Sequence, residues 1–370
     1  MTAAAVELEG APFLRELEAY LEKRFGTRVR VDDVRALGDD GGEKGFGYGV
    51  PIQISLHGAP ERELVLHTVT AGRGGHDTLA DRAAQALLAF ETFNELPRHV
   101  RALDVGALLD DGTRVSLARA RDFFFVTTFA EGSPYFHDLE RIGERGLTDR
   151  DRDRVDTLAS LLAHIHRERC DAPRVYERRL RQLVGDHECI AGLVDSYDMV
   201  ECAAFTSRSE LLSIERRCVE HRHRLKAFAH RLARVHGDFH PWNILFQEDE
   251  RPPTLLDRSR GEYGEPADDV AALVINYLVR ALQRDRGMTG PFAELWMRFF
   301  RSYLATTKDD ELALVLPPYL AWRALVLASP LWYPSFEPAL RRRIFDFIDA
   351  VLSAERFDFD RPEVWLQGRA

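Results

Sequence analysis

The spacing of apolar residues changes once along this chain, near residue 131, and that change limits the folds open to it. Before this point, short runs follow the two-residue period of a β-strand, with turns between them. After it, apolar residues recur every three or four positions, as on one face of a helix. A length of 370 residues also suits two cores better than one. We therefore predict an α+β, bilobal protein, with a small sheet-containing lobe over residues 1–131 and a larger helical lobe over residues 132–370.

The first lobe is expected to hold an antiparallel sheet and one long helix. Residues 76–96 give a strong helical pattern, and residues 12–26 give a second, amphipathic one. An Asp-Asp-Gly turn at 110–112 separates two β-like runs and predicts a hairpin. The expected strands cover residues 28–37, 50–56, 63–69, 101–109, 113–120 and 123–132.

The second lobe is expected to be helical with two short interruptions. We predict helices over residues 147–168, within the Arg-rich region 173–232, and from 267–282 onward, where prolines mark the breaks. Two short strands are expected at 243–246 and 254–257, on either side of a polar segment.

Charge and composition narrow the class of partner. A formal net charge of −10 argues against nucleic acid, because binding to its phosphates needs a positive surface. The same charge weakly favours a cationic small molecule. The N-terminus lacks a signal-peptide pattern, the four cysteines form no C-x-x-C pair, and the apolar stretch 319–333 is interrupted by Arg323 and Pro330. We therefore expect a cytoplasmic protein without a membrane partner; the composition indicates no oligomeric state.

One segment, HGDFHPWNIL at residues 236–245, is unusually rich in polar side chains. Asp238 and Asn243 are five positions apart, and Asp257 follows 14 positions later at the end of an apolar run. Phosphoryl transfer from a nucleotide needs a carboxylate to accept the proton of the attacking hydroxyl, and oxygen ligands to hold Mg²⁺ against the phosphates. His236 and His240 also permit a dinuclear metallohydrolase, but no earlier D-x-H supplies the first ligands of such a site.

This segment and the one that follows resemble the aminoglycoside phosphotransferase and choline kinase family. The match combines HGDFHPWNIL with LLDRSRGEYGEPADDVAAL at 255–273, and is strong over residues 235–272. LLAHIHRE at 161–168 resembles the family's helix that precedes the catalytic loop. The positions that match the family pattern are His236, Gly237, Asp238, His240, Asn243, Asp257, Gly264, Glu265, Pro266 and Asp269.

The resemblance implies a protein-kinase-like fold and a role for each motif residue. Asp238 would be the catalytic base, and Asn243 and Asp257 would bind Mg²⁺. His236 and Asp269 would brace the catalytic loop. The phosphate donor would be ATP or GTP.

The resemblance also places the nucleotide in the first lobe. The run FFFVTTFAEG, which ends near Glu131, would lead into the hinge that meets the nucleotide base. Glu91 or Glu95, on helix 76–96, would pair with a phosphate-binding lysine on the strand 63–69. That strand carries His67 at the expected place, and a neutral imidazole does not do a lysine's work on phosphate.

Three explanations of the missing lysine remain open. The strand alignment is shifted, or an arginine such as Arg62 or Arg73 substitutes, or Lys44 reaches the phosphates from the Gly-rich turn GDDGGEKGFGYG. We favour Lys44, because the backbone N–H groups of that turn, around Gly45 and Gly47, are also a candidate phosphate cradle.

The sequence thus predicts a Mg²⁺-dependent small-molecule kinase that phosphorylates a hydroxyl group. The candidate acceptors on this scaffold include aminoglycosides, amino sugars, choline-like amines, macrolides and other hydroxylated metabolites. The alternative is a nucleotide-binding pseudokinase or regulatory module, which the absence of the strand lysine motivates.

Overall fold

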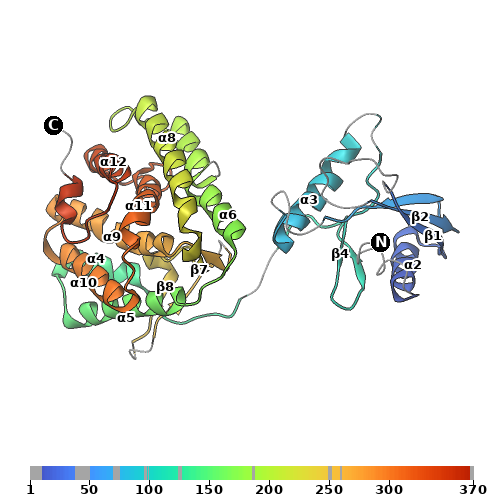
Figure 1. Ribbon diagram of the computed structural model, residues 1–370, viewed down its shortest axis with the longest axis horizontal. Coiled ribbons are helices and arrows are strands. Elements are labelled where there is room, and N and C mark those ends of the chain that lie inside the picture. The colour runs from blue at the N-terminus through green and yellow to red at the C-terminus, as the bar shows by residue number, and fades with distance from the viewer. Residues whose placement is uncertain are drawn as a thin grey trace. The chain divides into compact units, whose positions relative to one another are not determined.

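The chain divides into two compact units, Met1–Thr127 and Thr128–Ala370, each with its own helices and strands (Figure 1). A computed structural model describes residues 11–37, 51–69, 76–95, 98, 100–123, 127–185, 188–248, 252–258 and 261–366. Lys44, Gly45, Gly47 and Arg73 lie outside the described residues.

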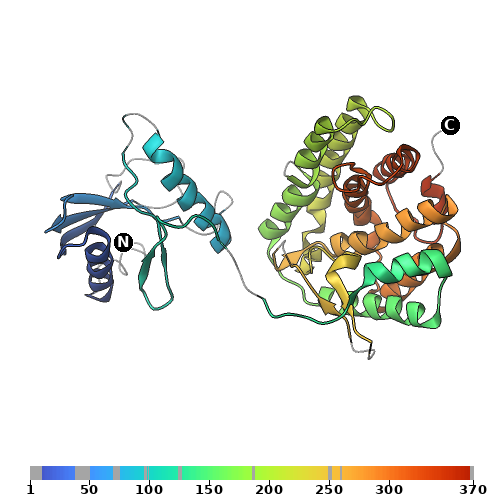
Figure 2. The same ribbon diagram turned by 180° about the vertical axis from the view of Figure 1, so that it is seen from behind.

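The N-terminal unit is built on a three-stranded antiparallel sheet in the order β1 (Arg30–Ala36), β2 (Ile52–His57) and β3 (Glu63–Leu66). The inward-facing residues of β2 alternate with partly exposed ones, as a sheet covered on one face requires. Helix α2 (Ala11–Phe25) covers that face (Figure 2). The small core between them contains Leu17, Leu21, Val29, Ile52, Ile54 and Leu56.

The other predicted elements of this unit form with shorter bounds. Helix α3 (Leu79–Thr92) begins with a capping box between Thr78 and Asp81 and continues into a 3-10 turn, η1 (Phe93–Glu95). The hairpin around Asp-Asp-Gly is confirmed, with β4 (Gly106–Leu108) antiparallel to β5 (Arg114–Ser116).

Two predicted strands need correction. β3 ends at Leu66, so His67 follows the strand, where its side chain is exposed. In the run 123–132, residues 124–126 lie outside the described chain, and 127–132 form no strand. An apolar run becomes a strand only where another strand pairs with it, and pairing begins later, at β6 (Ser133–Pro134).

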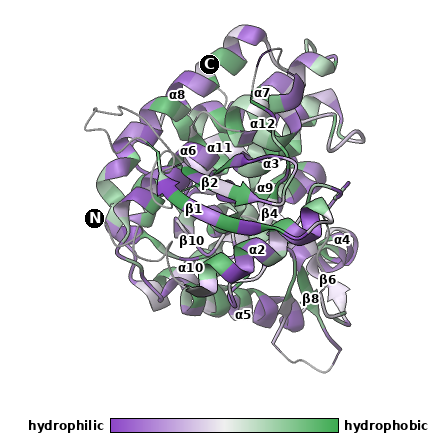
Figure 3. Cartoon of the chain, turned by 90° about the vertical axis from the view of Figure 1, so that its right-hand side faces the viewer, coloured by the Kyte–Doolittle hydropathy of each residue, from purple (hydrophilic) through white to green (hydrophobic). Residues whose placement is uncertain are grey.

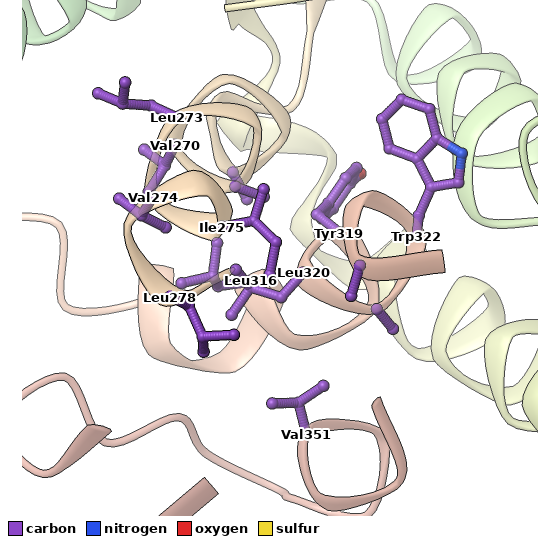
Figure 4. Packing of buried hydrophobic residues seen from close by; sticks show 14 of the residues in the cluster. Val270, Leu273, Val274, Ile275, Leu278, Leu316, Tyr319, Leu320, Trp322 and Val351 are labelled. Carbon is purple, nitrogen blue, oxygen red and sulfur yellow. The ribbon is translucent and has the colours of Figure 1, made fainter. Parts of the chain in front are cut away.

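The C-terminal unit is mainly helical. Helix α9 (Pro266–Asp285) is buried along most of its length and packs against α10 (Gly290–Thr307) and α11 (Leu312–Ala328). Its apolar side chains meet those of α11 in the core shown in Figure 4. Helix α8 (Arg208–Leu225) carries both hydrophilic and hydrophobic stretches, as a helix with one buried face should (Figure 3). The remaining helices are α4 (Tyr135–Arg145), α5 (Asp149–His166), α6 (Pro173–Val184), α7 (Leu193–Ser196) and α12 (Pro338–Leu352).

Prolines do not all end helices here, contrary to the prediction. Pro317 and Pro318 lie inside α11. Because a proline has no N–H, the carbonyl four residues before it loses its helical partner. For Pro317 that carbonyl belongs to Ala313, and it accepts a hydrogen bond from the backbone N of Phe357 at 2.7 Å instead. At Pro317, therefore, another segment supplies the hydrogen bond that the helix lacks.

Short strands enclose the polar segment in this unit. β7 (Ala233–Arg234) pairs with β10 (Tyr263–Gly264), and β8 (Ile244–Phe246) lies between β6 and β9 (Thr254–Leu255). The segment from Val235 to Asn243 thus leaves one strand and enters another. None of the helices described has the combination of length and apolar content needed to cross a bilayer.

Candidate functional site

A single buried carboxylate fixes the start of the polar loop. Asp269, in the first turn of α9, accepts hydrogen bonds from the backbone N of His236 and of Gly237, each at 2.7 Å. His166, at the end of α5, approaches the same carboxylate with its Nε2 at 3.1 Å, and its Nδ1 lies 2.8 Å from the hydroxyl of Tyr303. Burial alone would raise the pKa of Asp269, but these hydrogen bonds outweigh it and hold the pKa below its usual range.

An ion-pair network fixes the N-terminus of α9, from which Asp269 projects. Glu265 caps the helix by accepting from the backbone N of Ala267, and it also accepts from Tyr176 and Arg231. Arg231 is almost fully buried and pairs with Asp309 as well. Buried charges need such complete pairing, so this network gives α9 a defined start.

Asp238 does not stand alone, because Arg323 of α11 reaches it. Nη1 of Arg323 lies 2.5 Å from Oδ1 of Asp238. The same guanidinium binds Asp268 through Nε at 3.1 Å and Nη2 at 2.8 Å, and Nη2 also donates to the carbonyl of Gly237 at 3.2 Å. Burial alone would lower the pKa of Arg323, but Asp268 and Asp238 raise it, so the guanidinium is charged. One buried cation therefore links two carboxylates.

The sequence analysis did not identify Arg323 as a site residue. The sequence nevertheless contains an indication of its importance. A single arginine in the apolar stretch YLAWRALVLASPLWY must be paired with a carboxylate or other acceptor if that helix is buried. Its partner Asp238 is 85 positions away. Nothing in the local pattern could name that partner.

His240 lies on the other side of the Asp238 carboxylate. Its Nδ1 accepts from the backbone N of Trp242 at 3.3 Å, and its Nε2 is 3.7 Å from Oδ2 of Asp238. Burial lowers the pKa of His240 below its ordinary value, against the pull of Asp238, and Arg323 adds to the lowering. The imidazole is therefore neutral at pH 7, with its proton on Nε2. His236 has a structural contact instead, since its Nδ1 accepts from the backbone N of Asp238 at 3.2 Å.

Asn243 and Asp257 lie at adjacent ends of two paired strands. Asn243 directly precedes β8, and its carbonyl accepts from the backbone N of Leu256 at 2.9 Å. Its Nδ2 donates to the carbonyl of Asp238 at 3.0 Å, so the amide oxygen is the atom available to a cation. Asp257 is exposed and has a left-handed backbone, with φ of 54°, which Asp tolerates better than most residues. One amide oxygen and one carboxylate fit the hard oxygen ligands that Mg²⁺ prefers.

A metal cage of another kind is not found. Within the ranges that the structure describes, no group of three or more His, Cys, Asp or Glu side chains could hold a metal ion.

An aromatic surface flanks the loop. Trp242 is 45% exposed and stacks on Phe136 of α4, with ring centroids 4.2 Å apart.

The described nucleotide candidates of the sequence analysis are divided between the two units. His67 and Glu91 are exposed residues of the N-terminal unit, as is Glu95. Glu131 is an exposed residue of the C-terminal unit, and its carbonyl accepts from Nε2 of Gln247 at 3.2 Å.

Comparison with solved structures gives several kinases with low sequence identity. A glucosamine kinase in complex with glucosamine, ADP and inorganic phosphate is 17% identical over 56% of this chain and 57% of its own, a little over half its length, with a TM-score of 0.40. A choline kinase from Cryptosporidium parvum Iowa II is 12% identical over 91% of this chain and 88% of its own, with a TM-score of 0.33. An aminoglycoside-3'-phosphotransferase of type VIII is 20% identical over 85% and 98%, with a TM-score of 0.32.

The family assignment comes from sequence. No curated protein matches the chain. A model of the phosphotransferase enzyme family, by contrast, matches residues 78–313, which is more than half of the chain and includes the whole polar loop. This match confirms the expected family, and the helices and strands of the two units confirm the expected α+β class. The chain therefore belongs to the phosphotransferase enzyme family.

Proposed function

We propose that this protein transfers the γ-phosphate of ATP or GTP to a hydroxyl of a small molecule in a Mg²⁺-dependent reaction. The observation that carries the proposal is the grouping of Asp238, Asn243 and Asp257 at one loop and one strand end. The reaction class needs one base and two oxygen ligands, and these are the groups supplied.

Asp238 is proposed as the base. It would accept the proton of the acceptor hydroxyl while that oxygen forms its bond to the γ-phosphorus. Its side chain is partly exposed, at 16%, so an acceptor can reach it, while the hydrogen bonds to Asp269 fix the loop behind it. Catalysis would then depend mostly on positioning and charge neutralisation.

Asn243 and Asp257 are proposed as the Mg²⁺ ligands. Bound there, the ion would neutralise charge on the transferred phosphate. The hydrogen bond from Nδ2 of Asn243 to the Asp238 carbonyl would turn the amide oxygen towards the ion. His236 would contribute by accepting the backbone N–H of Asp238 and so shaping the loop.

The N-terminal lobe, residues 1–131, is proposed to hold the nucleotide, and residues 132–370 the acceptor. Lys44, with the backbone around Gly45 and Gly47, would bind the phosphates in place of the lysine that His67 replaces. Glu91 would pair with that lysine, and the chain near Glu131 would meet the nucleotide base.

The first test is calorimetric titration of MgATP and of MgGTP into wild-type protein and into Asp257→Ala. We expect binding by the wild type that requires Mg²⁺ and is lost in the variant. A transfer assay would follow, with glucosamine, choline, ethanolamine, kanamycin and erythromycin as acceptors. Asp238→Asn should then bind MgATP normally but lose turnover by about a thousandfold, as expected on loss of a general base.

The same experiments separate an active kinase from a pseudokinase. Binding of Mg-nucleotide without transfer to any acceptor or to water would favour a nucleotide-binding regulatory module. The observation behind that alternative is that neither β3 nor the exposed His67 that follows it supplies a lysine. Lys44→Ala tests the replacement directly: an unchanged turnover would remove Lys44 from the site.

A further inference from the structure

We propose that Asp238 and His240 form a slot for the acceptor hydroxyl, and that Arg323, anchored by Asp268, sets the orientation of the slot. The inference rests on the phosphotransfer function proposed above and adds two residues to it. Arg323 is a positioning residue in this proposal, because it acts through Asp238. His240 would contact the acceptor itself.

Arg323 is well placed to fix one end of the carboxylate. Its side chain is 8% exposed and that of Asp268 is 2% exposed, so the pair is a rigid, desolvated support. Three of its nitrogen atoms are engaged, with Asp268, Gly237 and Asp238, and its guanidinium also lies 3.8 Å over the ring of Trp322. Arginine is the residue that can hold several partners in one plane, which a lysine ammonium cannot do.

The orientation places the second carboxylate oxygen towards His240. With Oδ1 of Asp238 at Arg323, Oδ2 lies 3.7 Å from Nε2 of His240. That separation is too long for a direct hydrogen bond, whose usual limit is about 3.2 Å. An oxygen atom beside the line that joins them can lie about 2.8 Å from each. One hydroxyl group can therefore contact both atoms at once.

The polarity of the two groups suits a hydroxyl. Because Nδ1 of His240 accepts from the backbone N of Trp242, the ring proton is on Nε2, which donates. A hydroxyl in the slot would accept from Nε2 and donate to Oδ2. In the transfer, its O–H bond breaks and the proton goes to Oδ2. Its oxygen forms the new bond to the γ-phosphorus, and the bond from that phosphorus to the nucleoside diphosphate breaks.

The test compares Arg323→Lys and Arg323→Met with a matched buried arginine. Arg341 of α12 is 3% exposed and donates to the carbonyls of Ala328, Tyr333 and Phe336, so Arg341→Met measures the loss of a buried guanidinium elsewhere. For each variant we would measure the melting temperature, MgATP binding by calorimetry, and kcat and KM. Phosphate transfer would be measured to the most active acceptor of the panel. Transfer to water would be measured as phosphate release from MgATP.

Arg323→Met should lower kcat by about a hundredfold, the cost of a misplaced reacting group, with MgATP binding unchanged. Arg323→Lys should recover part of that loss, because it restores the charge without the fixed geometry. Arg341→Met should affect the melting temperature but leave kcat within about twofold of wild type at a temperature where it is folded.

For the slot itself, His240→Leu should raise the acceptor KM about tenfold, the value of one hydrogen bond, whereas His240→Gln, which keeps a donor near Nε2, should raise it less.

The outcomes distinguish this inference from the function beneath it. If the wild type transfers phosphate and Arg323→Met transfers it equally well, the positioning role is overturned. The same holds if Arg323→Met loses no more activity than Arg341→Met does. Equal KM values for His240→Leu and wild type would overturn the slot. Wild-type protein that neither binds MgATP nor transfers phosphate would overturn the proposed function, and the slot with it.

Discussion

Asp269 shows how one buried side chain can fix the start of a polar loop. It is fully buried, and its acceptors are used by two backbone N–H groups and by His166. A carboxylate has only acceptors, so it suits a position where every neighbour is a donor. An amide of the same shape would bring an NH₂ group against one of those donors.

Asp269→Asn should therefore lower the free energy of unfolding by about 3 kcal/mol, the typical cost of a buried donor left unpaired in a charged network. The measurement is urea unfolding followed by tryptophan fluorescence, because all five tryptophans lie in Thr128–Ala370. The exposed Asp360→Asn is the control and should change stability by less than about 0.5 kcal/mol. Equal effects of the two changes would contradict the bracing role.

His221 should make stability depend on pH near neutrality. It is buried on α8, with Nε2 at 3.0 Å from the carbonyl of Leu352 and Nδ1 at 2.8 Å from Nη2 of Arg224. Burial chiefly lowers its pKa in the folded state below the ordinary 6.5, so the unfolded chain binds the proton more tightly. Its contribution is thus complete above pH 6.5 and is lost as the pH falls below that value.

Urea unfolding at pH 7.5 and at pH 5.5 tests this dependence. His221→Gln keeps a donor for Leu352 but does not titrate, so the variant should lose less stability than wild type between the two pH values. The other histidines are present in both proteins, so their effects cancel in the comparison. A loss as large in the variant as in wild type would exclude His221 as its source.

Residues close together in sequence could be assigned to the site before the structure, and distant ones could not. Asp238 and Asn243 share one loop, and Asp257 follows within the next strand. The spacing of such residues is a local property that a sequence retains. Arg323 comes from another helix, and the contact depends on how α11 packs against α9.

At the scale of elements, apolar spacing predicted the helices of the C-terminal unit because they bury one face or most of their length. It failed where an element depends on its partners. The run 123–132 is apolar enough for a strand, but residues 127–132 pair with none of the strands in the described ranges. Pro317 would normally end a helix, but the N–H of Phe357 satisfies the carbonyl that it leaves unpaired. Neither the lack of a pairing strand nor the contact with Phe357 can be read from the local sequence.

The packing of α11 against α9 can be tested at Leu320. This side chain is fully buried between the two helices and lies one turn before Arg323 (Figure 4). Leu320→Ala should lower the free energy of unfolding by about 2–5 kcal/mol, through lost burial and the cavity it leaves. Leu331→Ala, at a residue 48% exposed, should change it by less than about 0.5 kcal/mol in the same assay. A small effect at Leu320 would mean that α11 is not held by this contact.

At the scale of the whole molecule, the acidic charge bears on which acceptor is used. A formal net charge of −10 produces a negative potential that attracts cations from solution, and dissolved salt weakens that attraction. The effect acts on any cationic acceptor, whichever residues bind it. Two arginines oppose it locally: Arg323, which binds Asp238, and Arg280, whose guanidinium lies over the ring of Phe136. The balance of these arginines against Asp238, Asp257 and Asp268 therefore decides whether local charge adds to the long-range attraction or opposes it.

Salt dependence of the acceptor KM decides between them. If the net charge dominates, raising NaCl from about 0.05 M to 0.5 M should raise the KM of a cationic acceptor such as kanamycin or choline several-fold, since the Debye length shortens from roughly 14 Å to 4 Å. The KM of an uncharged hydroxylated acceptor should stay constant, which controls for effects of salt on the enzyme. A cationic acceptor whose KM is unchanged or falls with salt would show that the arginines near Asp238 set the local potential. The acceptor should then be sought among neutral or anionic molecules.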